Sequence, residues 1–459
     1  MASFDALIIG MGQAGPSLAA RLSAAGMKVA VVERDKFGGT CVNDGCTPTK
    51  AMVASAYAAH VARRSGDYGV IVDGTPRVDM KRVKARKDEI VLRSRSGLEK
   101  WMNDLKGTTV YRGHARFVGP SEVRVGSENL RAEKIFVNVG GRPLVPNMPG
   151  LDTVPSLTNV SMMEVDFIPQ HLLVVGGSYV GLEFAQMFRR FGARVTVIEM
   201  EERLVGREDE DVSLAIQDFL RDEGVALRLG AKCITARKEP DGLSVGVECR
   251  DGSPREAGTH LLLAVGRVPN TDDLGLEAAG IRTDNRGYIE VDDGLRSSNP
   301  NVWALGDCNG KGAFTHTAYN DYEIVADNVL SNAGRRKYTE RIPVYALYTD
   351  PPLGRVGMSE ADIRKNGLKA LVGKRPMSRV TRAVEKGETN GFLKIHVEQG
   401  SRRILGAALL GVGADESVHS ILDAVYSGMP YTEFQRHVRI HPTVSELIPT
   451  VLEDLSPLG

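Results

Sequence analysis

The sequence has no net charge, because its 58 lysines and arginines are balanced by 58 aspartates and glutamates. A neutral chain without a basic tract argues against nucleic acid or an anionic membrane as the main partner. No apolar run approaches the ~18 residues that a membrane-spanning helix needs. The first residues also lack the basic and apolar segments of a signal peptide. We therefore expect a protein without a membrane anchor.

Cysteine is scarce as well, with five residues in a chain of 459. So few cysteines do not form the disulfide framework of a secreted protein, which favours a reducing compartment and predicts a cytoplasmic location. Cys233, Cys249 and Cys308 are scattered along the chain, whereas Cys41 and Cys46 lie close together. The close pair needs an explanation of its own.

Glycine is abundant, with 50 residues, against a usual share of ~7%. This excess indicates many tight turns and close backbone approaches, which are common around bound phosphates. At about 150 residues per domain, the length predicts roughly three domains.

An internal repeat organises the first 200 residues. ALIIGMGQAG near the N-terminus and LLVVGGSYVG from Leu172 are both followed by a helical pattern and a second apolar strand. The spacing from Gly10 to Glu33 equals the spacing from Gly176 to Glu199. A single copy is compatible with an ordinary strand-turn-helix, but two copies in one register, each ending in an acid, predict two βαβ dinucleotide sites. The turn brings a pyrophosphate to a helix N-terminus, and the glutamate bonds a ribose.

The second copy departs from the fingerprint, because Ser178 replaces its middle glycine. Glu199 is followed by Glu201 and Glu202, and a 2′-phosphate there would meet several carboxylates at ~1–4 kcal/mol each. The sequence thus predicts a preference for NADH over NADPH. Arg203 is the nearby cation that favours the opposite outcome.

The close cysteine pair lies in GGTCVNDGCTPTK, residues 38–50, before an alanine-rich helical pattern that extends to about Arg64. Helix positions five apart point ~140° away from each other, so a bridge needs a distorted turn, which Gly45 permits. Thiols at a helix N-terminus are reactive because their pKa is lowered. A zinc site would need further ligands that the sequence does not supply nearby, and inert thiols would not need the surrounding glycines. We predict a redox-active disulfide and no metal site.

At this segment the sequence resembles the class I pyridine nucleotide-disulfide oxidoreductases. Four further segments resemble motifs of that family, in the family's order: His114–Val118, Gly266–Asn270, Ser298–Asp307 and His441–Glu446. The resemblance covers essentially the whole chain.

The resemblance implies an α/β fold with two Rossmann-like dinucleotide-binding domains, for FAD and NAD, and a C-terminal α+β dimerisation domain. It places the FAD-binding domain in residues 1–145 and 266–337, the NAD-binding domain in 146–265 and the dimerisation domain in 338–459. It also implies a homodimer with an active site shared across the interface. In the dimerisation domain, residues 391–397 and 404–410 predict a hairpin, and residues 415–428 predict a helix that ends at glycine.

The resemblance assigns site residues in three groups. Those expected at FAD are Gly10, Gly12, Gly15, Glu33, Gly39, Thr40, Lys50, Ala115, Gly306, Asp307, Thr315 and His316. Those expected at NAD are Gly176, Ser178, Tyr179, Gly181, Glu199 and Gly266. The catalytic residues are expected to be Cys41, Cys46, Lys50, Glu183, His441 and Glu446.

The roles follow the family's electron path. Tyr179 is similar to an aromatic gate that moves aside for nicotinamide, and hydride then passes through the flavin to the disulfide. Cys46 is expected to be the sulfur next to the flavin, and Cys41 the exposed thiol that attacks the substrate.

Three further interactions are expected around this path. His441, oriented by Glu446 and supplied by the other subunit, handles the proton of the leaving thiolate. Lys50 and Glu183 pair beside the flavin, where a cation stabilises developing negative charge. A helix is expected to begin near Thr315 and His316, and the positive end of its dipole also stabilises negative charge on the flavin.

The acceptor is less defined than the reaction class. Glu199 and the histidine-glutamate pair favour dihydrolipoyl dehydrogenase, whereas the segment FTHTAYNDY, residues 314–322, resembles a mercuric reductase-like branch that includes reductases for reactive chlorine species and hypothiocyanite. The chain ends without a cysteine pair, which argues against a true mercuric reductase. Glutathione reductase is disfavoured by the acidic cluster after Glu199. A flavoprotein oxidase and a non-catalytic redox sensor are the alternatives from other classes.

Overall fold

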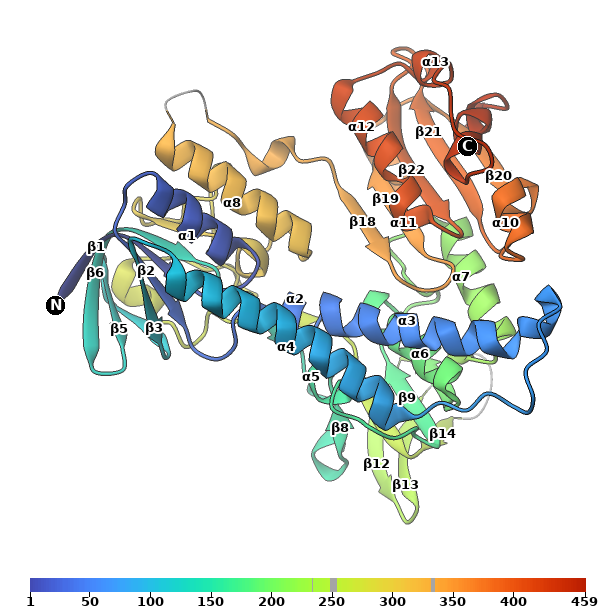
Figure 1. The fold of residues 1–459 in the computed structure, drawn as a ribbon, viewed down its shortest axis with the longest axis horizontal. Coiled ribbons are helices and arrows are strands. Elements are labelled where there is room, and N and C mark those ends of the chain that lie inside the picture. The colour runs from blue at the N-terminus through green and yellow to red at the C-terminus, as the bar shows by residue number, and fades with distance from the viewer. Residues whose placement is uncertain (233, 248–253, 332–334) are drawn as a thin grey trace.

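The computed structural model describes residues 1–232, 234–247, 254–331 and 335–459. Cys233 and Cys249 lie outside these residues. The chain forms three units, which Figure 1 shows at the left, at the bottom and at the upper right, with the N-terminus in the first and the C-terminus in the last. Among the described residues, no helix is both long and apolar enough to cross a membrane.

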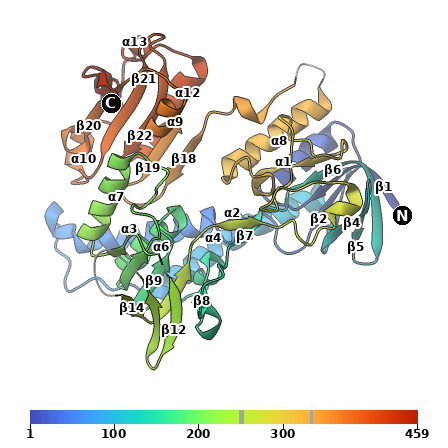
Figure 2. The ribbon, with the colours of Figure 1, turned by 180° about the vertical axis from the view of Figure 1, so that it is seen from behind.

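The first unit is built on a mostly parallel sheet with the strand order β3-β2-β1-β6-β5-β4, with β17 beside β6. Helices α1 and α8 lie next to each other on one side of this sheet (Figures 1 and 2). The elements are β1 (Ala2–Ile9), α1 (Ala14–Ala24), β2 (Val29–Glu33), β3 (Thr108–Arg112), β4 (Ala115–Gly119), β5 (Glu122–Val125), β6 (Glu128–Val137), β17 (Val302–Ala304) and α8 (Thr315–Leu330).

The second unit repeats this arrangement, with the strand order β11-β10-β9-β15-β8 and a three-stranded antiparallel sheet of β12, β13 and β14 at its side. Its elements are β8 (Ser156–Leu157), α5 (Asn159–Met162), β9 (His171–Val175), α6 (Tyr179–Phe191), β10 (Arg194–Ile198), α7 (Glu210–Asp222), β11 (Ala226–Arg228), β12 (Thr235–Glu239), β13 (Gly242–Gly246), β14 (Arg255–Gly258) and β15 (His260–Leu263). β1 and β9 are the equivalent first strands of the two copies, and each pairs in parallel with the strand after its helix.

Two connections join these units. The first is a pair of short antiparallel strands, β7 (Gly141–Pro143) and β16 (Arg267–Pro269). The second consists of the short helix α2 (Gly39–Asn43) and the long helices α3 (Cys46–Arg63) and α4 (Met80–Asp104). Figure 1 shows α3 and α4 running from the first unit to the second. The predicted helix after the cysteines is therefore confirmed as α3.

The third unit is an antiparallel sheet with the strand order β18-β19-β22-β21-β20-β23, flanked by short helices. Its elements are β18 (Val344–Leu347), β19 (Leu353–Gly357), α9 (Glu360–Lys365), β20 (Ala370–Pro376), α10 (Thr381–Glu385), β21 (Phe392–Glu398), β22 (Ile404–Leu410), α11 (Ala414–Ser417), α12 (His419–Ser427), α13 (Tyr431–Phe434) and β23 (Ser456–Pro457). The predicted hairpin is confirmed as the antiparallel pair β21–β22.

The helix predicted over residues 415–428 is divided into α11 and α12 at Val418. At the break, the hydroxyl of Ser420 donates to the carbonyl of Ser417, as serine side chains do when they compete with the helix backbone. Gly428 ends α12 in the left-handed conformation, with a φ of 65°, as the sequence predicted.

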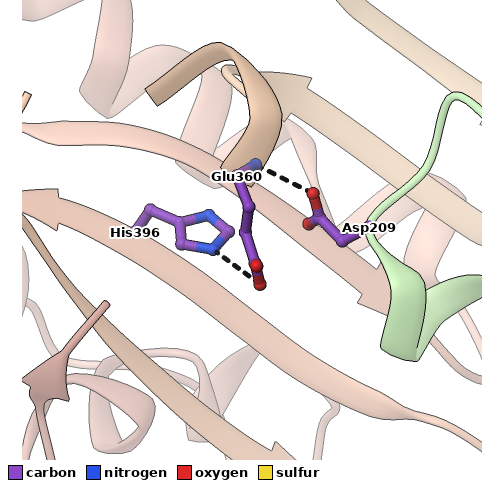
Figure 3. A group of neighbouring side chains, drawn as sticks. All are labelled: Asp209, Glu360 and His396. Atoms are coloured by element: carbon purple, nitrogen blue, oxygen red, sulfur yellow. Dashed lines mark hydrogen bonds and ion pairs between the residues drawn. The ribbon is translucent and has the colours of Figure 1, made fainter. Parts of the chain in front are cut away.

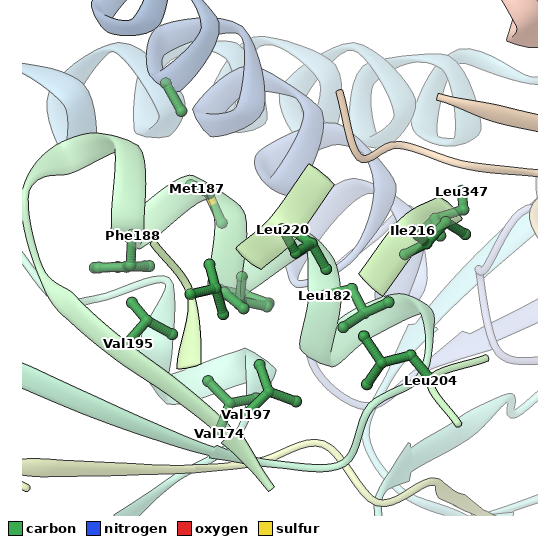
Figure 4. Packing of buried hydrophobic residues seen from close by; sticks show 14 of the residues in the cluster. Val174, Leu182, Met187, Phe188, Val195, Val197, Leu204, Ile216, Leu220 and Leu347 are labelled. Carbon is green, nitrogen blue, oxygen red and sulfur yellow. The ribbon is translucent and has the colours of Figure 1, made fainter. Parts of the chain in front are cut away.

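A hydrophobic core connects the units. Figure 4 shows apolar side chains of the second unit, such as Val174, Leu182 and Leu220, packed near Leu347 of the third. The same cluster includes Met52 from α3. Burial of each such side chain stabilises the folded state by ~1.5–3 kcal/mol. This shared core therefore fixes the second unit against α3 and against the third unit.

Candidate functional site

A cavity of about 980 Å³ extends from the carboxyl end of β2 to the N-termini of α3, α6 and α8. It brings together most of the residues predicted to bind FAD and most of those predicted to act on the disulfide. It also includes Tyr179 from the group predicted at NAD. The predicted site residues that line the cavity are Gly10, Gly12, Glu33, Gly39, Thr40, Cys41, Cys46, Lys50, Ala115, Tyr179, Glu183, Gly306, Asp307, Thr315 and His316. Gly15, Gly176, Ser178, Gly181, Glu199, Gly266, His441 and Glu446 do not line it.

The backbone of the first glycine turn fits a bound pyrophosphate. At Gly10, φ is 98° and a Cβ atom would lie 2.3 Å from the carbonyl oxygen of Asn138. At Gly39, φ is 59° and a Cβ atom would lie 2.8 Å from the Cα of Gly12. These glycines let two backbone segments meet beside the N-terminus of α1, where free N–H groups favour an anion. The tight glycine turn and the volume of the cavity fit FAD.

The two glutamates of the repeat make the same contacts. Glu33 accepts hydrogen bonds from the backbone N–H of Met11 at 2.8 Å and of Asp35 at 2.9 Å. Glu199 accepts from Gly177 at 2.5 Å and from Glu201 at 3.0 Å. Each carboxylate therefore holds its own glycine turn in place, a structural role that the spacing alone did not reveal.

The second glycine turn is equally tight. A Cβ atom at Gly181 would lie 2.0 Å from the carbonyl oxygen of Gly176. Ser178 lies exposed at the position before α6, and its side chain makes no capping hydrogen bond. The serine thus fits where the fingerprint has glycine, and Tyr179 becomes the first residue of α6.

The cysteine pair lies at the interruption between helices α2 and α3. Cys41 is in α2, Cys46 is the first residue of α3, and Gly45 between them has φ −132° and ψ −116°. A Cβ atom at Gly45 would lie 2.9 Å from the carbonyl oxygen of Thr40. Both cysteines are free thiols in this structure, so the disulfide stays a prediction for the oxidised state. Cys46 is exposed and Cys41 half-buried, the reverse of the expectation that Cys41 is the exposed thiol.

The surroundings of the two thiols shift their pKa values in opposite directions. A hydrogen bond from Cys41 lowers the pKa of Cys46 to about 6 against the effect of burial, with further lowering by Thr315 and Lys50. The same hydrogen bond, together with burial, raises the pKa of Cys41. Cys46 therefore loses its proton before Cys41 does.

Thr315, the first residue of α8, lies with its Oγ1 3.1 Å from the Sγ of Cys46. We expect Thr315→Val to raise the pKa of Cys46 by about one unit, because a hydrogen bond to a charged group is worth ~1.5–3 kcal/mol. The thiolate absorbance of the reduced protein, followed against pH, measures this pKa. Thr47→Val, beside Cys46 on α3, is the matched control; an equal shift in both variants contradicts the assignment to Thr315.

Lys50 and Glu183 form an ion pair that lines the cavity. The Nζ of Lys50 lies 2.9 and 2.8 Å from the two carboxylate oxygens of Glu183 and 4.5 Å from the centre of the Tyr348 ring. Glu183 is buried and also accepts from the backbone N–H of Tyr348 at 3.0 Å. The predicted contact between Lys50 and Glu183 is present, and the charge of Lys50 lowers the pKa of Cys46.

His441 and Glu446 are paired outside the cavity. The Nδ1 of His441 lies 2.8 Å from Oε2 of Glu446, while the His441 side chain is 71% exposed and that of Glu446 only 12%. The pair is thus preformed on the surface of the third unit.

Three residues that the sequence analysis did not select also shape the cavity. Asn138 donates to the carbonyl of Gly10 at 3.2 Å. The Nε of Arg267 lies 3.7 Å from Oδ2 of Asp307, whose pKa is raised by burial and lowered in part by Arg267. Asn43 lies between the two cysteines and donates to the carbonyls of Phe37 and Gly39, both at 2.9 Å. The position of Asn43 between the cysteines was its only sequence signal.

Comparison with known proteins agrees with this geometry. The sequence profile described as pyridine nucleotide-disulphide oxidoreductase matches residues 4–321, and the profile of the corresponding dimerisation domain matches residues 344–452.

Similar proteins cover nearly the whole chain. The probable pyridine nucleotide-disulfide oxidoreductase RclA of Escherichia coli strain K12 is 35% identical over 454 residues, covering 97% of this chain and 98% of that protein. A mercuric reductase of Streptomyces lividans is 33% identical, covering 97% and 94%. A dihydrolipoyl dehydrogenase of Haloferax volcanii is 32% identical, covering 98% and 96%. The solved Cu(II) complex of the HOCl-induced flavoprotein disulfide reductase RclA from Escherichia coli superposes with a TM-score of 0.89 at 34% identity, covering 99% of each chain.

Proposed function

Because the chain belongs to the pyridine nucleotide-disulphide oxidoreductase family, whose members use FAD and NAD(P)H, we propose that it passes two electrons from NADH to the Cys41–Cys46 pair. We further propose that the reduced pair acts on a small disulfide or an oxidised thiol.

One observation carries this proposal. Cys41, Cys46, the Lys50–Glu183 pair and Tyr179 line the same cavity as the glycine turn and Glu33. The glycine turn and Glu33 would hold FAD at its phosphates and ribose, and the other residues of the cavity would surround the rest of the group. Bound FAD supplies the chemistry that the side chains lack, since it accepts a hydride and gives up two electrons to a disulfide.

The thiols have separate tasks in the reaction. Cys41 gives its proton to His441, and its sulfur attacks one sulfur of the substrate. A mixed disulfide forms, and the other substrate sulfur leaves as a thiolate. Cys46 then attacks the sulfur of Cys41, which restores the internal disulfide and releases the second substrate thiolate. Both released thiolates need a proton, and two electrons move from the cysteine pair to the substrate.

His441 is the proposed proton donor for these thiolates. Its contact with Glu446 fixes the tautomer that leaves Nε2 free and stabilises the imidazolium. His441 does not line the cavity of its own chain, and the chain carries the family's dimerisation domain. We therefore infer a homodimer in which each His441 serves the cavity of the other subunit.

We expect NADH to be preferred over NADPH by at least about tenfold in kcat/KM, since repulsion between a 2′-phosphate and Glu199 costs ~1–4 kcal/mol. Glu199→Gln should narrow this preference while keeping an acceptor for the N–H of Gly177. Steady-state kinetics with both coenzymes measures the ratio.

Asp218→Asn is the matched control for charge, because Asp218 is an exposed residue on α7 in the same unit. An equal change in both variants, or a preference for NADPH in the unaltered protein, contradicts the role of Glu199.

The acceptor is tested by anaerobic NADH oxidation with lipoamide, oxidised glutathione, hypothiocyanite, Hg²⁺ and Cu²⁺, and by a parallel assay with O₂ alone. Turnover with a disulfide or hypothiocyanite supports the proposal. Turnover with O₂ alone supports an oxidase and contradicts it. Metal reduction is the second candidate, because two adjacent thiols suit soft metal ions and a Cu(II) complex of the similar RclA has been solved.

A further inference from the structure

A buried charge network joins the second unit to the third, next to the cavity. Glu208 and Asp209 immediately precede α7, Arg355 lies on β19 and Lys394 lies on β21. Arg355 and Lys394 are each 1% exposed. Charges buried to this degree are costly unless each one is paired, so the pairing determines how firmly the loop before α7 is held.

Asp209 is the centre of this pairing. Its carboxylate lies 2.8 Å from Nη1 of Arg355 and 2.9 Å from Nζ of Lys394, and it accepts from the backbone N–H of Glu360 at 2.8 Å. Although burial acts in the opposite direction, Arg355 and Lys394 hold the pKa of Asp209 far below its usual range.

Figure 3 shows Asp209, Glu360 and His396 around a common point, an arrangement that resembles a metal site. Lys394, however, places its Nζ 2.9 Å from Oδ2 of Asp209 and 2.9 Å from Oε1 of Glu360. The cation between these carboxylates is therefore an ammonium group. The cluster fastens the loop that carries Glu208, and it fixes that side chain beside the cavity.

Glu208 connects this network to the cavity. Its side chain is 0% exposed, and its Oε1 accepts hydrogen bonds from the hydroxyls of Tyr179 at 2.7 Å and of Tyr345 at 2.8 Å. Its Oε2 lies 3.8 Å from Nη1 of Arg355 and has no hydrogen-bond partner among the described residues. Burial and the nearby Glu208 carboxylate raise the pKa of Tyr179, which keeps its hydroxyl protonated as a donor.

Aromatic contacts complete the surroundings of Tyr179. Its ring meets those of Tyr345 and Phe314 edge-on, with centres 5.7 and 6.3 Å apart. Tyr345 and Phe314 are stacked, with centres 5.4 Å apart. Tyr179 and Phe314 line the cavity, and the hydroxyl of Tyr179 bonds Glu208, which does not line it.

We propose that Glu208 is a positioning residue that holds Tyr179 closed over the nicotinamide side of the cavity, and that entry of nicotinamide breaks the Tyr179–Glu208 hydrogen bond. When Tyr179 moves aside, Glu208 keeps Tyr345 as its partner and remains near Arg355, so the buried carboxylate is not left without a donor. This inference rests on the proposed function and on the role of Tyr179 as the gate for nicotinamide, which the family resemblance implies.

The proposal predicts that the NADH concentration for half-maximal flavin reduction changes in opposite directions in two variants. Glu208→Gln weakens the bond that holds the gate, so the open fraction rises and the NADH concentration for half-maximal flavin reduction falls about tenfold. Tyr345→Phe leaves Tyr179 as the remaining hydroxyl donor to Glu208, so opening becomes harder and this concentration rises. Anaerobic stopped-flow measurement of flavin reduction against NADH concentration separates half-saturation from the limiting rate.

A double-mutant cycle tests whether Glu208 acts through the Tyr179 hydroxyl. Tyr179→Phe should lower the half-saturating concentration as Glu208→Gln does, and Glu208→Gln should add nothing in the Tyr179→Phe background. The same Glu208→Gln effect in both backgrounds overturns the proposal. Glu256→Gln, which removes a buried carboxylate paired with Arg228 elsewhere in the second unit, is the control and should leave half-saturation unchanged.

Failure of the proposal and failure of the enzyme assignment give different results. If NADH reduces the flavin of the unaltered protein but the cycle shows no coupling, the gate proposal alone is wrong. If NADH does not reduce that flavin, the proposed function is wrong as well. Tyr179→Phe provides an independent arm if Glu208→Gln lowers the yield of folded protein, and no fall in half-saturation with Tyr179→Phe also overturns the proposal.

Discussion

Cys46→Ser and Cys41→Ser are each expected to lower NADH-dependent disulfide turnover by at least about a thousandfold, as removal of a reacting nucleophile does in other enzymes. Neither serine can form the disulfide that carries two electrons from the cofactor to the substrate. The first reduction of the flavin by NADH should remain in both variants, because the hydride reaches the cofactor before the thiols act. Anaerobic NADH oxidation with the disulfide identified in the acceptor panel measures the loss.

Cys308→Ser is the matched control for these variants. Cys308 is fully buried, its Sγ lies 3.4 Å from the carbonyl of Val137, and burial raises its pKa to about 12, so this thiol is unreactive near neutral pH. Its replacement should leave turnover intact. Appreciable turnover in Cys41→Ser or Cys46→Ser would show that electrons leave the cofactor by another route.

His441→Ala is expected to lower disulfide turnover by about 10²- to 10⁴-fold, the range for loss of a general acid or base. Flavin reduction by NADH should be unchanged, since the proton is needed when the substrate thiolate leaves. His437→Ala is the control, because His437 is a neighbouring exposed histidine on the same segment. Unchanged turnover in His441→Ala would exclude it as the proton donor.

The His441→Ala variant also tests whether the active site is shared between two subunits. Dimers that combine one Cys41→Ser chain with one His441→Ala chain contain one cavity with both intact cysteines and the partner's intact His441. Such mixed dimers should regain turnover that neither parent dimer has. Their inactivity would indicate that His441 serves the cavity of its own chain.

The fold could be predicted from sequence because its signals are local and repeated. The spacing from Gly10 to Glu33 and from Gly176 to Glu199 identified two Rossmann-like units, and the structure and the family match confirm the α/β class with a dimerisation domain. The domain boundaries stay predictions, as do the roles of the individual site residues.

Other features depended on contacts between distant segments. Glu208, Arg355 and Lys394 meet only when the second and third units pack, and no local pattern marks a buried carboxylate that accepts from two tyrosines. The division of the helix at Val418 coincides with a serine hydroxyl that bonds a nearby carbonyl, which the apolar spacing does not reveal. The separation of the two cysteine pKa values likewise required Thr315, which lies 269 residues from Cys46.

The central claim is that the Cys46 sulfur lies against the flavin as a thiolate. Anaerobic addition of two electrons as NADH, followed by absorbance spectroscopy, tests it most directly. We expect a long-wavelength charge-transfer band in the unaltered protein and in Cys41→Ser, and none in Cys46→Ser. A band that persists in Cys46→Ser, or its absence from the unaltered protein, would contradict the account.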